Sequence, residues 1–152
     1  MQTVKIEAFK VIGLSVRTTN ENMQAAQDIP ALWNKFMTEG IAAQIPNKVE
    51  ESIFCIYTNY EGDHTMPYDT ILGCKVNSLD DVPEGMVGQA FESGEHAKFM
   101  AKGNLTQGAV YQKWLEIWGA DLDRKYTVDF EVYGEKAMNP TDAEVDIFVA
   151  VN

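Results

Sequence analysis

The sequence predicts one α+β domain over residues 1–152, built from a strand, helix, strand, strand unit that occurs twice. Two amphipathic helical patterns, at residues 25–37 and 106–118, are each preceded by one strand-like segment and followed by two more. Each helical pattern also has a tryptophan on its apolar stripe. These observations indicate an old duplication, with pseudo-repeats at about residues 1–78 and 79–152.

The first strand is expected at residues 9–19, where FKVIGLSVRTT is rich in β-branched residues and partly alternates. In residues 25–37 the apolar side chains recur every three or four positions, which is the stripe of an amphipathic helix, and Gly40 stops it. The stripe consists of Ile29, Leu32, Trp33, Phe36 and Met37.

Two further strands are expected to complete the first half. Residues 52–60, SIFCIYTNY, form a nearly continuous apolar run, which is typical of a strand covered on both faces. After a polar loop, residues 68–76 form another strand-like segment. Each segment contains one of the two cysteines, Cys55 and Cys74, which lack metal-ligand spacing and are expected to be buried thiols.

The second half repeats this order. Residues 96–102 alternate like a strand, and residues 128–134 and 144–151 read as a hairpin. Between them, residues 106–118 predict a helix that Gly119 stops. Two hairpins can join in one antiparallel sheet with both helices on one face, so a cleft between the helices is the expected pocket. The stripe of the second helix consists of Val110, Tyr111, Trp114, Leu115, Ile117 and Trp118.

The charge of the chain is one-sided, with 23 acidic and 12 basic residues and a formal net charge of -11. Such a field repels phosphate backbones, so we expect no direct binding to nucleic acid. It attracts cations, although acidity also serves solubility alone. No apolar run is long enough to span a membrane, and the first ten residues lack the apolar core of a signal peptide, so we expect a cytoplasmic protein of bacterial type.

Generic enzyme motifs are absent from the sequence. No cysteines and histidines cluster at metal-ligand spacing, no glycine-rich loop leads from a strand into a helix, and no serine lies in a nucleophile-elbow pattern. We therefore expect no metal and no cofactor. His64 and His96 could each serve as an acid or a base, but a lone histidine is more often an ordinary surface or core residue.

Glu131 is set between two apolar residues of a predicted strand. By strand alternation it shares one face with Asp129 and Tyr133, and that face could be the solvated one. The alternative is a pocket, where the buried charge would need a hydrogen-bond partner or a bound cation. Most of the many aromatic residues must be core, but a group of them around one carboxylate would bind planar or quaternary cations. Alternation leaves both alternatives open.

Seven short motifs, spread over nearly the whole chain, are weak singly and specific in their order and spacing. They are VIGLSVRTTNEN, IPALWNKF, IPNKV, YTNYEGDHTMPY, ILGCKV, VPEGM and DFEVY. In this order the chain resembles the gyrase-inhibitory-protein-like small-molecule-binding domains, which are called effector-binding domains when attached to AraC-type or MerR-type regulators.

The resemblance implies a concave antiparallel sheet with two helices, and a central cleft that binds small, often lipophilic or cationic, compounds. It also implies that the glutamate of an FExY pattern, here Glu131, is the anionic anchor in the cleft. Relatives that regulate transcription carry a DNA-binding domain, for which this chain has no room, so it looks like the stand-alone form. The aromatic residues expected around the ligand are Trp33, Trp114, Tyr57, Tyr68, Tyr133, Phe36 and Trp118.

We therefore expect a binding module for a small hydrophobic or cationic aromatic molecule rather than an enzyme. One alternative is a hydrolase of reactive electrophiles, in which Glu131 would be the catalytic residue that activates water. A second alternative is a gyrase-inhibitor-like module that binds a protein. The sequence leaves open the ligand, a protein partner and a homodimer.

Overall fold

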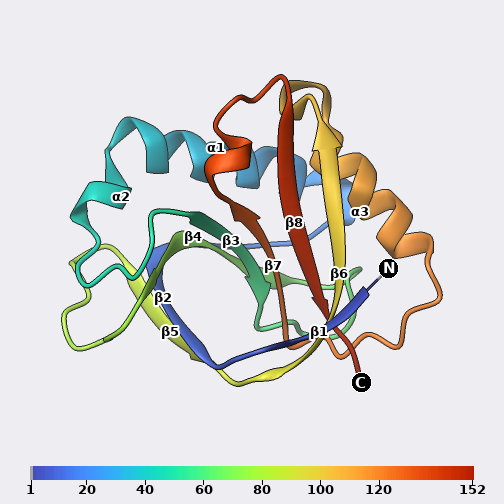
Figure 1. Ribbon diagram of the computed structural model, residues 1–152, viewed down its shortest axis with the longest axis horizontal. Coiled ribbons are helices and arrows are strands. Elements are labelled where there is room, and N and C mark those ends of the chain that lie inside the picture. The colour runs from blue at the N-terminus through green and yellow to red at the C-terminus, as the bar shows by residue number, and fades with distance from the viewer. Residues whose placement is uncertain (1) are drawn as a thin grey trace.

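Eight strands form one antiparallel sheet in the computed structural model of the protein, which describes residues 2–152. Two longer helices, α1 and α3, lie against this sheet (Figure 1). The α+β class predicted from the sequence is confirmed. The strands are β1 (Gln2–Ile6), β2 (Phe9–Thr18), β3 (Ile53–Thr58), β4 (Tyr68–Val76), β5 (Val87–Phe91), β6 (Gly94–Gly103), β7 (Val128–Tyr133) and β8 (Ala143–Ala150). The helices are α1 (Ala25–Thr38), α2 (Ile41–Gln44) and α3 (Ala109–Gly119).

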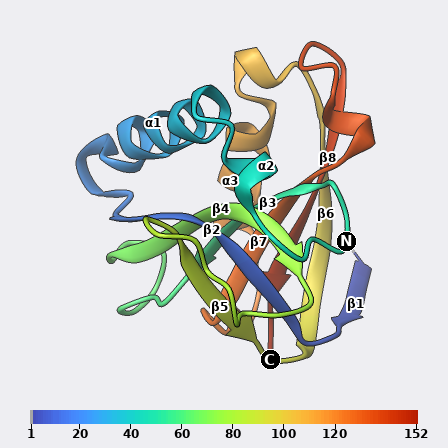
Figure 2. The ribbon, with the colours of Figure 1, turned by 90° about the vertical axis from the view of Figure 1, so that its left-hand side faces the viewer.

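The strand order in the sheet is β1-β6-β8-β7-β3-β4-β2-β5. The order β2, α1, β3, β4 is followed along the chain by β6, α3, β7, β8, as the sequence predicts. The two halves meet where β3 pairs with β7. Each half also gives one strand to the other, because β1 pairs with β6 and β5 pairs with β2 (Figure 2). The centre of the sheet therefore lies at the β3–β7 pair.

The sequence patterns predict neither of the two edge strands, β1 and β5. β1 and β5 each pair with one neighbour only, and most of their residues are exposed or half-buried. An edge strand with one solvated face needs few apolar residues, so it has little hydrophobic pattern to detect. The predicted start of the second helix was also three residues early, because Leu105–Gln107 form a separate 3-10 turn capped by the Asn104 side chain.

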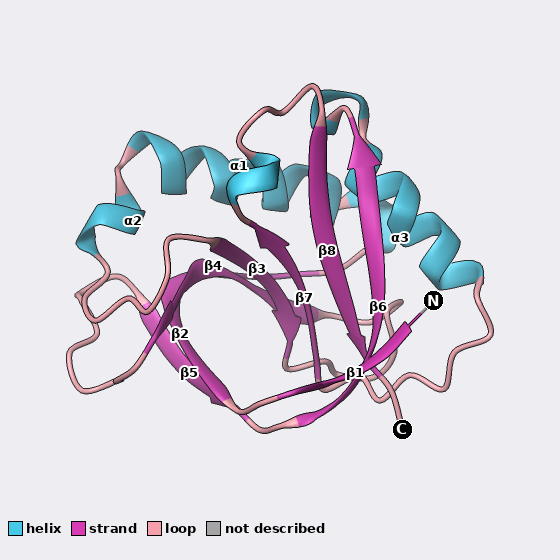
Figure 3. Ribbon diagram, in the orientation of Figure 1, coloured by secondary structure: helices cyan, strands magenta, loops and turns pink. Residues whose placement is uncertain are grey.

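The register fixes which residues face the helices. Leu14 pairs with Leu72, Leu72 with Cys55, and Cys55 with Glu131. Glu131 in turn pairs with Ile147. Residues opposite each other in paired strands point to the same face. This row is therefore apolar on both sides of a single carboxylate, and its apolar residues belong to the clusters that pack against α1 and α3. Figure 3 shows these two helices beside the sheet.

Separate apolar clusters occupy the two faces of the sheet. The helix face has one cluster under α1, which includes Leu32 and Phe36, and another under α3, which includes Trp114 and Ile117. On the opposite face the curved strands pack against one another through aromatic rings, with Phe130 and Phe148 stacked at 4.9 Å. The centre of the sheet is therefore packed on both faces.

Some residues of the predicted helical stripes are not in the core. Met37 is 62% exposed, and Tyr111 and Leu115 are each 48% exposed. The 3.6-residue period places them at the margins of the apolar face, where the sheet does not reach. The two cysteines are buried free thiols, as expected, and Cys55 is opposite Leu72 rather than Cys74.

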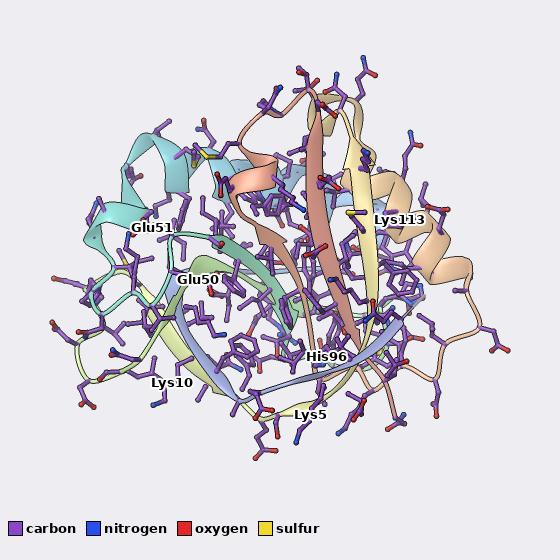
Figure 4. All side chains as sticks on the ribbon, viewed as in Figure 1. Lys5, Lys10, Glu50, Glu51, His96 and Lys113 are labelled. Carbon is purple, nitrogen blue, oxygen red and sulfur yellow. The ribbon has the colours of Figure 1, made fainter. Side chains whose placement is uncertain are left out.

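Most charged residues are exposed or half-buried. Lys5 and Lys10 are exposed on the outside of the molecule, whereas His96 on β6 is only 2% exposed (Figure 4). Among residues 2–152, no helix is long and apolar enough to cross a membrane.

Candidate ligand-binding site

A cavity of about 370 Å³ lies between α1, α3 and the centre of the sheet. Its walls are mostly apolar and aromatic, and it has only one buried carboxylate among its lining residues. Strands β3, β4 and β7 supply its floor, the two helices supply its sides, and the segments around residues 20–23, 60–64 and 124 complete its lining. The lining residues are Asn20, Met23, Ala25, Ala26, Ile29, Pro30, Trp33, Tyr57, Tyr60, His64, Tyr68, Val110, Tyr111, Trp114, Trp118, Arg124, Glu131 and Tyr133.

Glu131 lies on the floor of this cavity and is 1% exposed. Three neutral groups donate hydrogen bonds to its carboxylate. The Tyr57 hydroxyl donates to Oε2 at 2.7 Å, and the Trp114 indole N–H donates to the same oxygen at 2.6 Å. The Tyr133 hydroxyl donates to Oε1 at 2.5 Å. The described part of the chain provides no ion-pair partner for Glu131.

Burial dominates the electrostatics of this group. Loss of hydration raises the pKa of Glu131 above the ordinary value, while hydrogen bonds from Tyr133, Tyr57 and Trp114 act in the opposite direction. Burial also raises the pKa values of the Tyr57 and Tyr133 hydroxyls, and the Glu131 charge adds to that rise. Both phenols therefore remain protonated donors at neutral pH.

The aromatic walls are built from ring pairs that cross the boundary between the two halves. Trp33 on α1 meets Tyr133 on β7 edge to face at 4.7 Å. Tyr57 on β3 meets Trp114 on α3 edge to face at 5.5 Å. Since Tyr57 and Tyr133 also donate to Glu131, their hydrogen bonds and ring packing fix the same two side chains. The walls are therefore positioned before any ligand binds.

A second buried carboxylate lies two residues earlier on β7. Asp129 is fully buried and accepts hydrogen bonds from the Tyr60 hydroxyl at 2.6 Å and from the backbone N–H of Ala150 at 2.8 Å. Its Oδ2 also lies 2.7 Å from Nη2 of Arg124, and that guanidinium side chain is 6% exposed. Asp129 is thus charge-balanced within the protein.

Seven of the eight residues predicted for the site line this cavity. Phe36 does not. It is 1% exposed and packs in the cluster between α1 and the sheet, because it lies about 60° around α1 from Trp33, which lines the cavity. The seven residues that line the cavity are Trp33, Trp114, Tyr57, Tyr68, Tyr133, Trp118 and Glu131.

Several lining residues were not predicted. Tyr60, His64 and Arg124 come from loops, where no periodic pattern marks which side chains point inward. Tyr60 and His64 do lie within the YTNYEGDHTMPY motif, which was the available signal. His96 lies outside the cavity, and its Nε2 lies 3.1 Å from the carbonyl oxygen of Val128.

Comparison with known proteins identifies the family to which the chain belongs. Residues 2–151 match the family described as integron-associated effector binding proteins. The protein YobU of Bacillus subtilis (strain 168), named as a candidate transcriptional regulator, is 31% identical over 150 residues, which cover 96% of this chain and 94% of YobU. The chain belongs to the integron-associated effector binding family. Small-molecule binding is the function that this family membership supports.

Solved structures agree with the fold. An integron cassette protein from the mobile metagenome of Vibrio cholerae is 32% identical, with a TM-score of 0.76 over 99% of this chain and 95% of that chain. SAV2435, solved bound to tetraphenylphosphonium, has a TM-score of 0.79 at 18% identity, over 99% of this chain and 93% of that chain. The expected kinship with effector-binding domains is confirmed, whereas the gyrase-inhibitor-like subtype stays a prediction.

Proposed function

We propose that this member of the effector-binding family binds lipophilic aromatic cations in the cavity between α1 and α3, with Glu131 as the counter-charge. The observation that carries the proposal is a carboxylate with 1% exposure that lines an aromatic cavity and has only neutral donors as partners.

An unpaired buried charge is costly, and the usual remedies are a counter-ion or a shift in pKa. Three hydrogen bonds reduce the cost for Glu131 but supply no positive charge. A ligand cation would supply it. Aromatic faces also attract cations, by about 2 kcal/mol or more where water is excluded. The charge of Glu131 and the aromatic walls of the cavity therefore both favour a cationic ligand.

The size and surroundings of the cavity agree with this class. A volume of about 370 Å³ is within the range of pockets that hold drug-sized molecules. The net charge of -11 raises the concentration of cations near the protein. SAV2435, which has the same fold, was solved with an aromatic cation, and this supports the assignment of the ligand class. Such a protein would act as a sequestrant or as a sensor that reports to a separate partner.

Titration with tetraphenylphosphonium tests the proposal. Trp33, Trp114 and Trp118 line the cavity, so their fluorescence should change on binding. Glu131→Gln keeps the shape and loses the charge, and we expect it to weaken binding by about thirtyfold, or about 2 kcal/mol. The matched control is Glu95→Gln, which removes an exposed carboxylate on β6 and should bind like the parent. Equal affinity in parent and Glu131→Gln would contradict the anchor role.

A hydrolase is the second candidate, and the raised pKa of Glu131 is the observation that favours it. A carboxyl group with a pKa closer to neutrality transfers protons more effectively at neutral pH. This function requires catalytic conversion of a strained electrophile, such as an epoxide, to its hydrolysed product by the parent and not by Glu131→Gln. If the parent binds ligands but does not hydrolyse the electrophile, the hydrolase function is excluded and only the binding function remains.

A further inference from the structure

One end of the cavity has polar groups that the binding of a simple cation does not use. Arg124 lines the cavity just before β7, and its side chain is 6% exposed. Nη2 is paired with Asp129 at 2.7 Å, whereas Nε and Nη1 are buried and have no hydrogen-bond partner within residues 2–152. Buried donors without acceptors are costly and uncommon in folded proteins. Two nitrogens of Arg124, which carry three N–H groups, are therefore free to bind an acceptor from outside the chain.

The charge of Arg124 is already balanced. Asp129 is fully buried, and its Oδ2 accepts hydrogen bonds from both Nη2 of Arg124 and the Tyr60 hydroxyl. The guanidinium group is also held against the ring of Tyr126, 4.4 Å from its centroid. Since the ion pair is neutral as a whole, it favours a neutral hydrogen-bond acceptor over a second anion.

His64 adds another polar atom at the same end. Its ring stacks on Trp118 at 5.5 Å with an interplanar angle of 11°, and its Nδ1 is buried without a partner in the described chain. Asn20 fixes this loop by donating to the His64 carbonyl at 2.8 Å. Burial and the positive charge of Arg124 lower the pKa of His64, so the imidazole is neutral at pH 7, and Nδ1 donates a hydrogen bond in the tautomer that carries the proton there.

We propose that Arg124 and His64 form a second, polar subsite for a neutral oxygen acceptor, so that the preferred ligand is an aromatic cation bearing a carbonyl, amide or sulfonyl group. This inference rests on the proposed function, because Glu131 holds the cationic part. Asp129 and Glu131 are two residues apart on one face of β7, or about 6–7 Å along the strand. One drug-sized molecule can therefore reach both ends of the cavity.

Three related cations serve as probes: tetraphenylphosphonium, its derivative with one para-carbamoyl group, and its derivative with one para-carboxylate group. We expect the parent to bind the carbamoyl derivative about fivefold more tightly than tetraphenylphosphonium, the gain typical of one added hydrogen bond. The carboxylate derivative should gain nothing, because the Arg124–Asp129 pair has no net charge to attract it and the Glu131 charge repels it. A carboxylate derivative that binds most tightly of the three would overturn the choice of a neutral acceptor.

Two variants test the roles of Arg124 and His64. The measured quantity is the affinity for the carbamoyl derivative divided by the affinity for tetraphenylphosphonium. Arg124→Lys keeps a positive charge beside Asp129 and removes Nε and Nη1, while His64→Phe keeps a ring on Trp118 and removes Nδ1. Each should bring the ratio close to one. Arg17→Lys, at an exposed arginine outside the cavity, is the matched control and should keep the parent ratio. His64→Phe still decides the matter if Arg124→Lys folds poorly by circular dichroism.

The two proposals fail differently. A ratio of one in the parent, or a parent-like ratio in both variants, refutes the polar subsite while Glu131-dependent binding of tetraphenylphosphonium stands. If tetraphenylphosphonium binds without dependence on Glu131, the proposed function fails, and the subsite inference fails with it.

Discussion

Asp129 and Glu131 are two carboxylates on the same strand and the same face, and both are buried. Asp129 has a cation, a phenol and a backbone N–H as partners. Glu131 has two phenols and an indole, all neutral. The Asp129 charge is balanced by Arg124 within the protein, whereas the Glu131 charge has no positive partner among the described residues.

This difference in partners indicates that Asp129 is structural and that Glu131 is available to a ligand. A carboxylate that is paired with Arg124 and bonded to the adjacent strand β8 joins parts of the fold. A carboxylate surrounded by neutral donors and cavity is held in place but keeps its net charge. Burial alone does not separate these roles, whereas the charge of the partners does.

Loss of the Asp129 charge should have the largest effect on stability. Asp129→Asn leaves Arg124 buried without a counter-charge, so we expect the free energy of unfolding to fall by about 3–5 kcal/mol. Urea denaturation measures it. The matched control is Asp146→Asn, because Asp146 is 3.9 Å from Lys98 in a partly exposed pair and should contribute at most about 1 kcal/mol. Similar losses in the two variants would show that the Arg124 pair is not structural.

Loss of the Glu131 charge should act in the opposite direction. The folded-state pKa of Glu131 is raised, so its contribution to stability is fully present below pH 4.5 and is lost as pH rises through the folded-state pKa. Glu131→Gln avoids that loss, and we expect it to be more stable than the parent at pH 7, by on the order of 1 kcal/mol.

The check is the difference between parent and Glu131→Gln in urea denaturation from pH 4 to pH 8, which cancels the other carboxylates. The difference should shrink toward pH 4. A variant that is less stable than the parent at pH 7 would mean that the ionised carboxylate stabilises the empty fold.

The smallest expected effect is a change in the pH dependence of ligand affinity, which distinguishes the tyrosine that donates to Glu131 from the one that donates to Asp129. Binding of a cation needs ionised Glu131, so affinity should fall as pH drops through its pKa. Tyr57→Phe removes one donor to the ionised form, which raises the pKa of Glu131 and moves the midpoint of the pH–affinity curve to higher pH. Tyr60→Phe, which removes a donor to Asp129, should leave the midpoint in place. Equal shifts would show that the two carboxylates are coupled.

The α+β class, the element order and most boundaries followed from the sequence because they depend on local patterns. The period of 3.6 in α1 and α3 and the apolar run in β3 are visible within a few neighbouring residues. β1 and β5 were missed because a short edge strand buries little apolar surface. The same periodicity could not distinguish Phe36 in the core from Trp33 at the cavity, since both lie on the buried side of α1.

The sequence by itself determined that Asp129, Glu131 and Tyr133 share a face, and family motifs indicated Glu131 as the anchor. Only the tertiary structure decided that this face lies under the helices, that Tyr57 and Trp114 donate to Glu131, and that Arg124 pairs with Asp129. These partners come from β3, α3 and a loop, far apart along the chain. Strand alternation fixes the direction of a side chain, but its charge balance depends on which distant segments the sheet register brings beside it.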